Sequence, residues 1–117
     1  MPLPDFIRAF PAIDLPFPDD VVRTNVLRSD AGLAVFFTFL KDVDLPAHAH
    51  KGQWGTVLEG SIELTMDGRT RSYHPGETYS IPSGTLHAAR IPAGTVVLDI
   101  FEEPDRYKLR DPAGPSR

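Results

Sequence analysis

The sequence contains no cysteine, so its 117 residues have no disulfide framework. A chain of this length suits one domain and can bury about two-thirds of the surface that its unfolded form exposes. It can therefore fold without cross-links. The absence of cysteine also fits a reducing compartment. The N-terminus lacks the basic start and apolar run of a signal peptide, and together these features favour a cytoplasmic location.

Long apolar runs and an excess of positive charge are also missing. No segment approaches the ~20 apolar residues that a membrane helix requires, and the longest run, 33–40, has the length of a strand. The formal net charge is −4 and the basic residues are scattered, which argues against binding to a phosphate backbone. We expect neither a membrane nor a nucleic acid as a partner, and a small molecule as the ligand.

Prolines and glycines are abundant, with twelve and nine respectively, and most of them separate short apolar runs. Val, Ile, Thr, Phe and Tyr dominate these runs, as they do in half-buried strands, and no run keeps a helical period for three turns. Asp67-Gly68 between two such runs is a strong hairpin signal. The pattern predicts an all-β sandwich, jelly roll or barrel. The expected strands are 21–28, 33–41, 46–50, 53–59, 61–66, 69–74, 77–81, 86–91 and 95–102.

The N-terminal segment, 1–20, carries five prolines and several large apolar residues. Proline disfavours helix, so we expect an extended arm. An apolar arm should be covered, either by its own barrel or by the barrel of a partner, and the second arrangement would give a homodimer by strand exchange. The barrel should then occupy 21–103, followed by a polar tail over 104–117.

Histidines supply the candidate chemistry. His48 and His50 are two apart in an expected strand, so their side chains should share one face, although such a pair is often only a pair of half-buried polar residues. Gly52 permits a bend that would turn Gln53 toward the same face. Downstream, the turn Pro82-Ser83-Gly84 would place His87 at the start of the next strand. His74 lies in a turn and is expected to be an exposed loop residue.

These residues resemble the two motifs of the cupin family. The first reads His48-Ala49-His50, two residues, Gln53, six residues, Gly60. The second reads Gly76, five residues, Pro82-Ser83-Gly84, two residues and His87, and paired motifs in this order are specific. The resemblance to small RmlC-like cupins implies a double-stranded β-helix, a jelly-roll barrel that holds one divalent transition metal (Zn, Ni, Fe or Mn). It implies His48, His50 and His87 as ligands, with Gln53 as the fourth.

The sequence departs from the family pattern at three places that bear on the site. Gln53 stands where the family usually has Glu, the gap between His50 and Gln53 is one residue short, and Asp42 stands at the position of the opening glycine. A fourth departure, Ile91 in place of Asn, concerns structure more than ligation. The amide of Gln53 is neutral, so a divalent ion here would keep its full +2 charge and favour anionic ligands.

The leading functional hypothesis is a metal-dependent enzyme of the isomerase or lyase type. The ion would act as a Lewis acid on a small anionic sugar- or keto-acid-like substrate, with Tyr79 and Arg90 as candidate catalytic residues and Trp54 as a possible pocket residue. By strand parity Gly55 would lie on the side of Gln53 and keep the pocket floor open. Two alternatives stay open: an Fe(II)-dependent dioxygenase, and a non-catalytic barrel that binds a metal or a small molecule.

Overall fold

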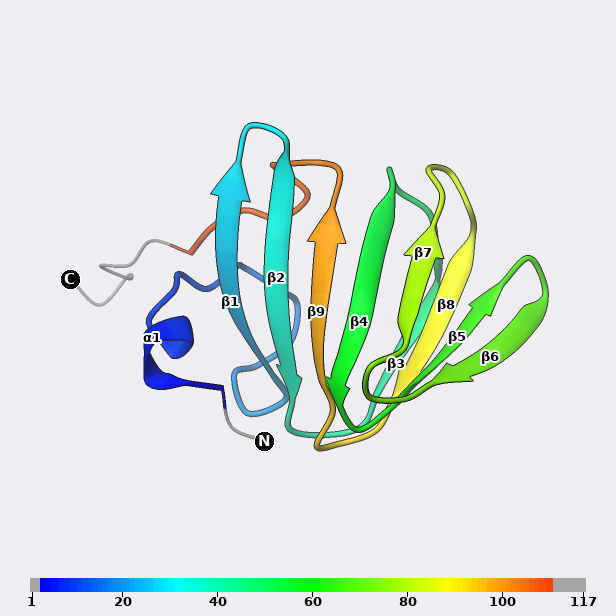
Figure 1. The fold of residues 1–117 in the computed structure, drawn as a ribbon, viewed down its shortest axis with the longest axis horizontal. Coiled ribbons are helices and arrows are strands. Elements are labelled where there is room, and N and C mark those ends of the chain that lie inside the picture. Colours follow the sequence, from blue (N-terminus) through cyan, green and yellow to red (C-terminus); the bar gives the residue numbers. More distant parts are fainter. Residues whose placement is uncertain (1–2, 111–117) are drawn as a thin grey trace.

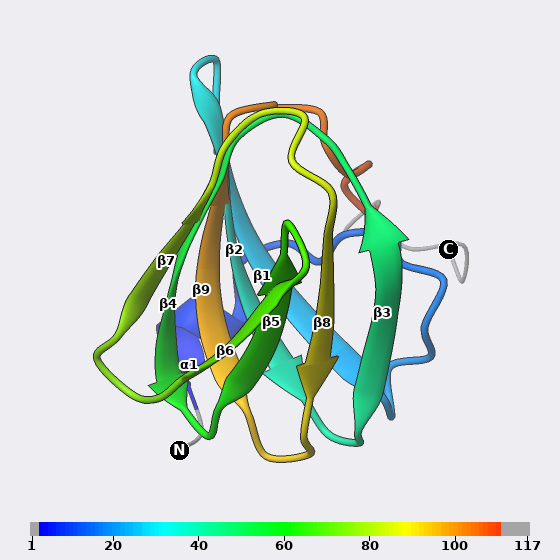
Figure 2. The ribbon, with the colours of Figure 1, turned by 90° about the vertical axis from the view of Figure 1, so that its right-hand side faces the viewer.

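Two antiparallel sheets lie face to face and enclose the apolar core (Figure 2). The computed structural model describes residues 3–110. Its elements are α1 (Asp5–Arg8), β1 (Val22–Ser29), β2 (Gly32–Phe39), β3 (Val43–His48), β4 (Gln53–Glu59), β5 (Ile62–Met66), β6 (Arg69–Tyr73), β7 (Thr78–Ile81), β8 (His87–Ile91) and β9 (Val96–Phe101). One sheet has the order β1-β2-β9-β4-β7 and the other β3-β8-β5-β6 (Figure 1). Strands distant in sequence are thus neighbours in each sheet, which is the jelly-roll arrangement that the sequence predicts.

The strands follow the alternation of the sequence. In β2 every second residue is buried, from Leu33 to Phe39, and the residues between them face outward. Each of the nine expected strands has a counterpart in the structure, and eight of them have both ends within two residues of the prediction. The third was wrong: it runs from Val43 to His48 and not from 46 to 50. Pro46 does not begin the strand but lies within it, which is tolerated because β3 is at the edge of its sheet.

The predicted hairpin between β5 and β6 is confirmed. Asp67 and Gly68 have φ values of 51° and 75°, the left-handed conformation that a two-residue hairpin turn needs at both central positions. The turn sets the register in which Ile62 faces Tyr73 and Leu64 faces Arg71. In the part of the chain that the structure describes, no helix is long and apolar enough to cross a bilayer.

The N-terminal arm differs from the expected extended segment, because Asp5–Arg8 forms one helical turn. Pro4 directly precedes this turn, where a missing N–H costs nothing. Further along, Ile13 pairs with Leu109 of the C-terminal segment, and Asp14 donates its N–H to the carbonyl of Lys108. The described parts of the arm and tail therefore pair with each other on their own barrel. Residues 1–2 of the arm and 111–117 of the tail lie outside the described residues.

We expect Ile13→Ala to lower the free energy of unfolding by about 2–5 kcal/mol, because Ile13 is fully buried and its removal leaves a cavity under the arm. Phe6→Ala is the control, because the Phe6 side chain in the same arm is 69% exposed and its loss should cost within about 0.5 kcal/mol. Urea titration followed by circular dichroism measures both. Equal losses in the two variants would contradict the anchoring role of Ile13.

Candidate metal centre

Three histidines from two parts of the chain converge at one end of the barrel. His48 ends β3, His50 lies in the bend that follows, and His87 begins β8. Their ligand atoms all lie within 4.8 Å of one another, and His48 faces His87 across the two strands. The expectation that His48 and His50 share a strand was wrong, since the strand ends at His48. A register irregularity between Leu45 and His48 turns the chain so that both rings still face the cluster.

Each imidazole is oriented by a backbone carbonyl. Nδ1 of His48 lies 2.9 Å from the carbonyl oxygen of Pro46, Nδ1 of His87 lies 2.9 Å from that of Thr85, and Nδ1 of His50 lies 2.6 Å from that of Lys51. A carbonyl oxygen only accepts, so Nδ1 carries the proton in all three rings. When such a ring is neutral, Nε2 keeps its lone pair, which is the tautomer that a metal ligand requires.

The bend that carries His50 is fastened to the end of β9. Gly52 donates its N–H to a carboxylate oxygen of Glu102 at 3.0 Å, and the backbone of Glu102 donates to the carbonyl of Gly52 at 2.8 Å. Lys51 donates to Glu103 at 3.1 Å. The carbonyl of His50 accepts the N–H of Gly84 at 2.9 Å. The last bond joins the bend to the Pro82–Thr85 turn, so the two histidine-bearing segments are positioned against each other before any ion binds.

Gln53, the first residue of β4, lines the same cavity as the three histidines. Its side chain hydrogen-bonds the carboxyl group of Asp99. An ionised carboxylate only accepts, so the amide NH₂ of Gln53 faces Asp99 and the amide oxygen is the atom left for a metal. This contact accounts for glutamine at a position where the family pattern has glutamate, because a second carboxylate beside Asp99 would place two like charges together.

Asp99 is a carboxyl group buried inside the barrel. The hydroxyl of Tyr79 donates a hydrogen bond to it at 2.6 Å. Burial raises the pKa of Asp99 to about 6, while the hydrogen bonds from Tyr79 and Gln53 act in the opposite direction. Burial, together with the adjacent Asp99, raises the pKa of Tyr79 far above its ordinary value. At neutral pH the pair is therefore an ionised carboxylate held by a protonated phenol.

Gly55 provides the space for this pair. A Cβ atom at position 55 would overlap the Asp99 carboxylate and the Tyr79 ring. By strand parity the sequence predicts that Gly55 lies on the side of Gln53 and keeps the pocket floor open. In the structure, the space beside Gly55 is occupied. A buried carboxylate and a tyrosine ring fill it.

The cavity has a polar end and an apolar end. Its volume is about 80 Å³. His48, His50, His87, Gln53 and Asp99 form the polar end. The remaining lining comes from the inward faces of both sheets and from the arm, and it includes Leu15, Phe17, Phe37, Phe39, Ile62, Leu64 and Val97.

Arg106 and Tyr107, from the C-terminal segment, were missed by sequence reasoning because they lie in no motif. Tyr107 lines the cavity and packs edge-on against Phe37 and Phe101. The guanidinium of Arg106 lies 4.6 Å from the centre of the Tyr107 ring. Burial, aided by the positive charge of Arg106, lowers the pKa of both His50 and His87. These two rings are thus neutral at physiological pH and ready to bind a cation.

Arg90 and Trp54 face away from the cavity. His87, Ala89 and Ile91 of β8 point into the barrel, so Arg90 projects outward, where it is exposed and pairs with Asp44 at 3.6 Å. Arg90, predicted as a catalytic candidate, therefore does not line the cavity that holds the histidines. Trp54, expected as a possible pocket residue, alternates with the inward Gln53 and Gly55 and lies on the outer face of its sheet. Tyr79, the other catalytic candidate, lies in the cavity lining.

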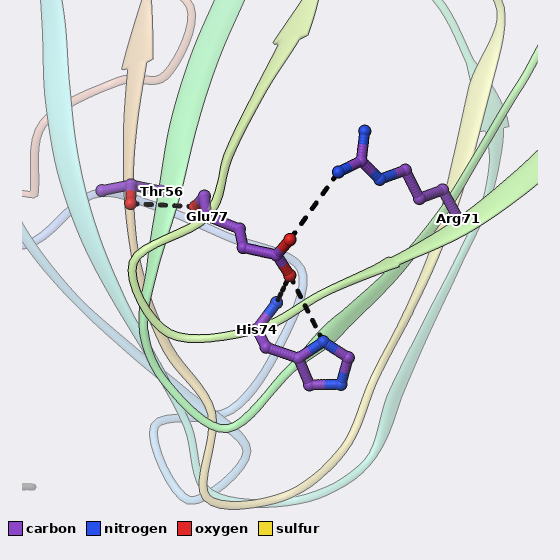
Figure 3. Close-up of polar contacts among 4 residues, drawn as sticks. All are labelled: Thr56, Arg71, His74 and Glu77. Atoms are coloured by element: carbon purple, nitrogen blue, oxygen red, sulfur yellow. Dashed lines mark hydrogen bonds and ion pairs between the residues drawn. The ribbon is translucent and has the colours of Figure 1, made fainter.

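His74, as expected, is an exposed loop residue outside the cluster. Its backbone N–H and its ring both contact the carboxylate of Glu77, at 2.8 and 3.3 Å, and Arg71 lies 3.7 Å from the same carboxylate (Figure 3). The carbonyl of Glu77 accepts the hydroxyl of Thr56 on the neighbouring strand. This group fastens the turn before β7 to β4, and its charges are solvated.

The donor set fits a divalent transition metal. Three imidazole nitrogens and one amide oxygen suit Zn, Fe, Ni or Mn better than Mg or Ca, which prefer sites made of oxygen ligands. The hydrogen bonds on Nδ1 and the Asp99 contact of Gln53 are the outer-shell partners that typically orient such ligands.

Comparison with known proteins supports the fold. A family model described as a cupin domain matches residues 35–101. Among curated proteins, none matches the chain. An RmlC-like cupin from Shewanella frigidimarina NCIMB 400 is 25% identical, with a TM-score of 0.70 over 84% of this chain and 86% of that one. KdgF from Halomonas sp. is 22% identical, with a TM-score of 0.66 over 80% and 89%. Oxalate decarboxylase from Bacillus subtilis, whose Mn(II) centres have been characterised, is 18% identical, with a TM-score of 0.63 over 77% of this chain and 28% of that one.

We expect Gly55→Ala to lower the free energy of unfolding by about 1–3 kcal/mol, the usual cost of overpacking a core, and to weaken metal binding by displacing Asp99 and with it Gln53. Thr78→Ala is the matched control, because Thr78 lies on the neighbouring strand with its side chain exposed. Chemical denaturation and isothermal titration with Zn²⁺ measure the two effects. Unchanged metal affinity in Gly55→Ala would contradict the coupling between Asp99 and Gln53.

Proposed function

This chain belongs to the cupin family, and on that premise we propose that it is a metal-dependent enzyme of the isomerase or lyase type acting on a small anionic sugar- or keto-acid-like molecule. The observation that carries the proposal is the meeting of three imidazoles, each with Nδ1 hydrogen-bonded to a backbone carbonyl, with a buried carboxylate in one small cavity. Besides its contact with Gln53, the Asp99 carboxylate lines the cavity, where a bound ligand could reach it. This placement supports chemistry at the bound ligand over simple metal storage.

The proposed ligands are His48, His50, His87 and Gln53. All four are neutral, so none of them would reduce the charge of a divalent ion. When bound, the ion would supply Lewis-acid polarisation of a substrate carbonyl. The chain's own part is to hold four donors around one point and to leave the remaining positions of the ion to the substrate.

Asp99 is the candidate base, in a role that Tyr79 supports. Its carboxylate lines the cavity, and its pKa of about 6 keeps it ionised but only weakly basic at neutral pH, which is the range in which a general base works well. It could accept a proton from a carbon next to a polarised carbonyl and return it elsewhere. The Tyr79 hydroxyl, which stays protonated, would hold the carboxylate in position throughout.

Arg106 supports an anionic substrate. Its Nε is buried and has no hydrogen-bond partner within residues 3–110, and its charge acts on two of the histidines. A substrate carboxylate bound at the metal would be attracted by that positive charge.

The proposal is tested by loading the protein with Zn²⁺, Ni²⁺, Mn²⁺ or Fe²⁺ and following sugar acids and keto acids by proton NMR, including exchange of their C–H protons with D₂O. We expect turnover or exchange with at least one metal. Asp99→Asn should retain the metal but lose rate by about 100-fold or more, the usual contribution of a general base. Oxygen consumption with Fe²⁺ alone would favour the dioxygenase, and tight binding without exchange would favour the non-catalytic barrel; either result would overturn the isomerase or lyase assignment.

We expect His50→Ala to abolish stoichiometric metal retention while the barrel stays folded, because His50 lies in a bend and not in a sheet. His74→Ala is the matched control, since it removes an imidazole outside the cluster. Elemental analysis of protein purified without a metal-affinity tag gives the metal content, and circular dichroism reports the fold. One equivalent of metal in the His50 variant would rule out the proposed ligand set.

A further inference from the structure

The cavity becomes apolar within one row of residues behind the histidines. His87, Ala89 and Ile91 follow one another along the inward face of β8, and each lies about 7 Å beyond the one before. Ala89 pairs with Leu45 of β3 on one side and with Leu64 of β5 on the other, and all three line the cavity (Figure 2). Behind His87, the wall formed by the four-stranded sheet is therefore hydrocarbon.

The opposite wall has one acidic residue at this depth. Phe101, Asp99 and Val97 follow one another along the inward face of β9, away from the polar end. Phe101 pairs with Gln53, and its ring centre lies 5.7 Å from that of His50. Asp99 thus lies one row deeper than the proposed ligands, and the apolar Val97 lies two rows deeper.

Few hydrogen-bonding groups face the interior of the cavity. The Asp99 carboxyl group already interacts with Tyr79 and Gln53. Tyr107 presents its ring edge-on to Phe37. Apart from these residues and the three histidines, every residue of the lining has a hydrocarbon side chain. A ligand hydroxyl buried beyond Asp99 would therefore lose its hydrogen bonds to water without replacement.

The position of Asp99 sets the direction in which a substrate would extend. This step rests on the proposed function, in which Asp99 accepts a proton from a carbon next to a carbonyl. The substrate carboxylate belongs at the polar end, where the charge of Arg106 acts. The reacting carbon must reach one row deeper, so the chain attached to it continues into the apolar rows and not toward the solvent.

We propose that the substrate is a 2-keto acid with a short hydrocarbon chain that carries no hydroxyl group, and that Ala89 provides the room for this chain. The methyl group of Ala89 leaves space between two leucines in the row directly behind His87. The cavity volume of about 80 Å³ is well below the roughly 300–1,000 Å³ of sites for drug-sized ligands, which favours a short chain. A keto acid is thereby favoured over a sugar acid, whose hydroxyls would have no partners in the apolar rows.

The chain is tested by calorimetric titration of the Zn²⁺-loaded full chain with pyruvate, 2-oxobutanoate and 2-oxopentanoate. Each added methylene should tighten binding about fourfold, the value of one buried CH₂. The matched control ligand, 4-hydroxy-2-oxopentanoate, should bind about 10-fold or more weakly than 2-oxopentanoate, because its hydroxyl would be buried without a partner. Constant affinity along the series would mean that the chain lies in solvent, and it would overturn the proposal. Equal affinity for the hydroxylated compound would overturn it as well.

The place of the chain is tested by Ala89→Val. The two added methyl groups should weaken binding of 2-oxopentanoate about 10-fold, while the affinities for pyruvate and Zn²⁺ and the circular dichroism stay as in wild type. Ala88→Val makes the same change on the outward face of β8 and should alter neither affinity. An equal loss for pyruvate and 2-oxopentanoate in Ala89→Val would show that the chain does not lie beside Ala89, against the proposal.

Binding and reaction are measured separately, so failure of this proposal can be told from failure of the proposed function. A preference for the longer chain, without exchange of the C3 protons in D₂O, would support the hydrocarbon chain and count against the enzyme assignment. Turnover of a polyhydroxylated sugar acid in preference to 2-oxopentanoate would leave the enzyme assignment in place and overturn the hydrocarbon chain.

Discussion

Asp99 places a carboxylate inside the barrel, where an ion without hydrogen-bonding partners is strongly disfavoured. Three features of the cavity supply the hydrogen bonds and the space that this carboxylate requires. Tyr79 donates its hydroxyl at 2.6 Å, Gln53 contributes a neutral amide that can face a carboxylate without repulsion, and Gly55 leaves the space that the pair occupies. The same contact engages the NH₂ of Gln53, which leaves the amide oxygen as the atom available to a metal.

The metal centre depends on backbone contacts as much as on its ligands. His48, His50 and His87 come from an edge strand, a bend and the start of another strand, so no single element could hold them together. Carbonyl oxygens fix the three rings, and Glu102 fixes the bend. Because these contacts do not involve the ion, the site is pre-organised, which lowers the ordering cost of binding.

The period of a strand links the inside of this barrel to its outside. Gln53 and Gly55 face the cavity, so Trp54 between them must face outward. Asp99 lies inside, and Ile100 next to it lies outside. Residues that line the cavity and apolar residues on the outer face of the sheet therefore alternate along β4 and β9. A substitution that shifted either strand by one residue would disturb both surfaces at once.

The sequence by itself determined the strands, the hairpin at Asp67-Gly68 and the set of histidines, because alternation, turn residues and motif spacing are local properties. Tertiary structure alone decided which residues share the cavity. That Arg90 faces away from the cavity could not be read from the sequence, because its direction depends on the register of β8. Arg106 and Tyr107 were missed because a tail without a motif gives no sign of folding back over the barrel mouth. The reason for glutamine rather than glutamate at position 53 is the neighbouring Asp99. Asp99 is 46 positions away in the chain, so only the folded structure brings the two residues together.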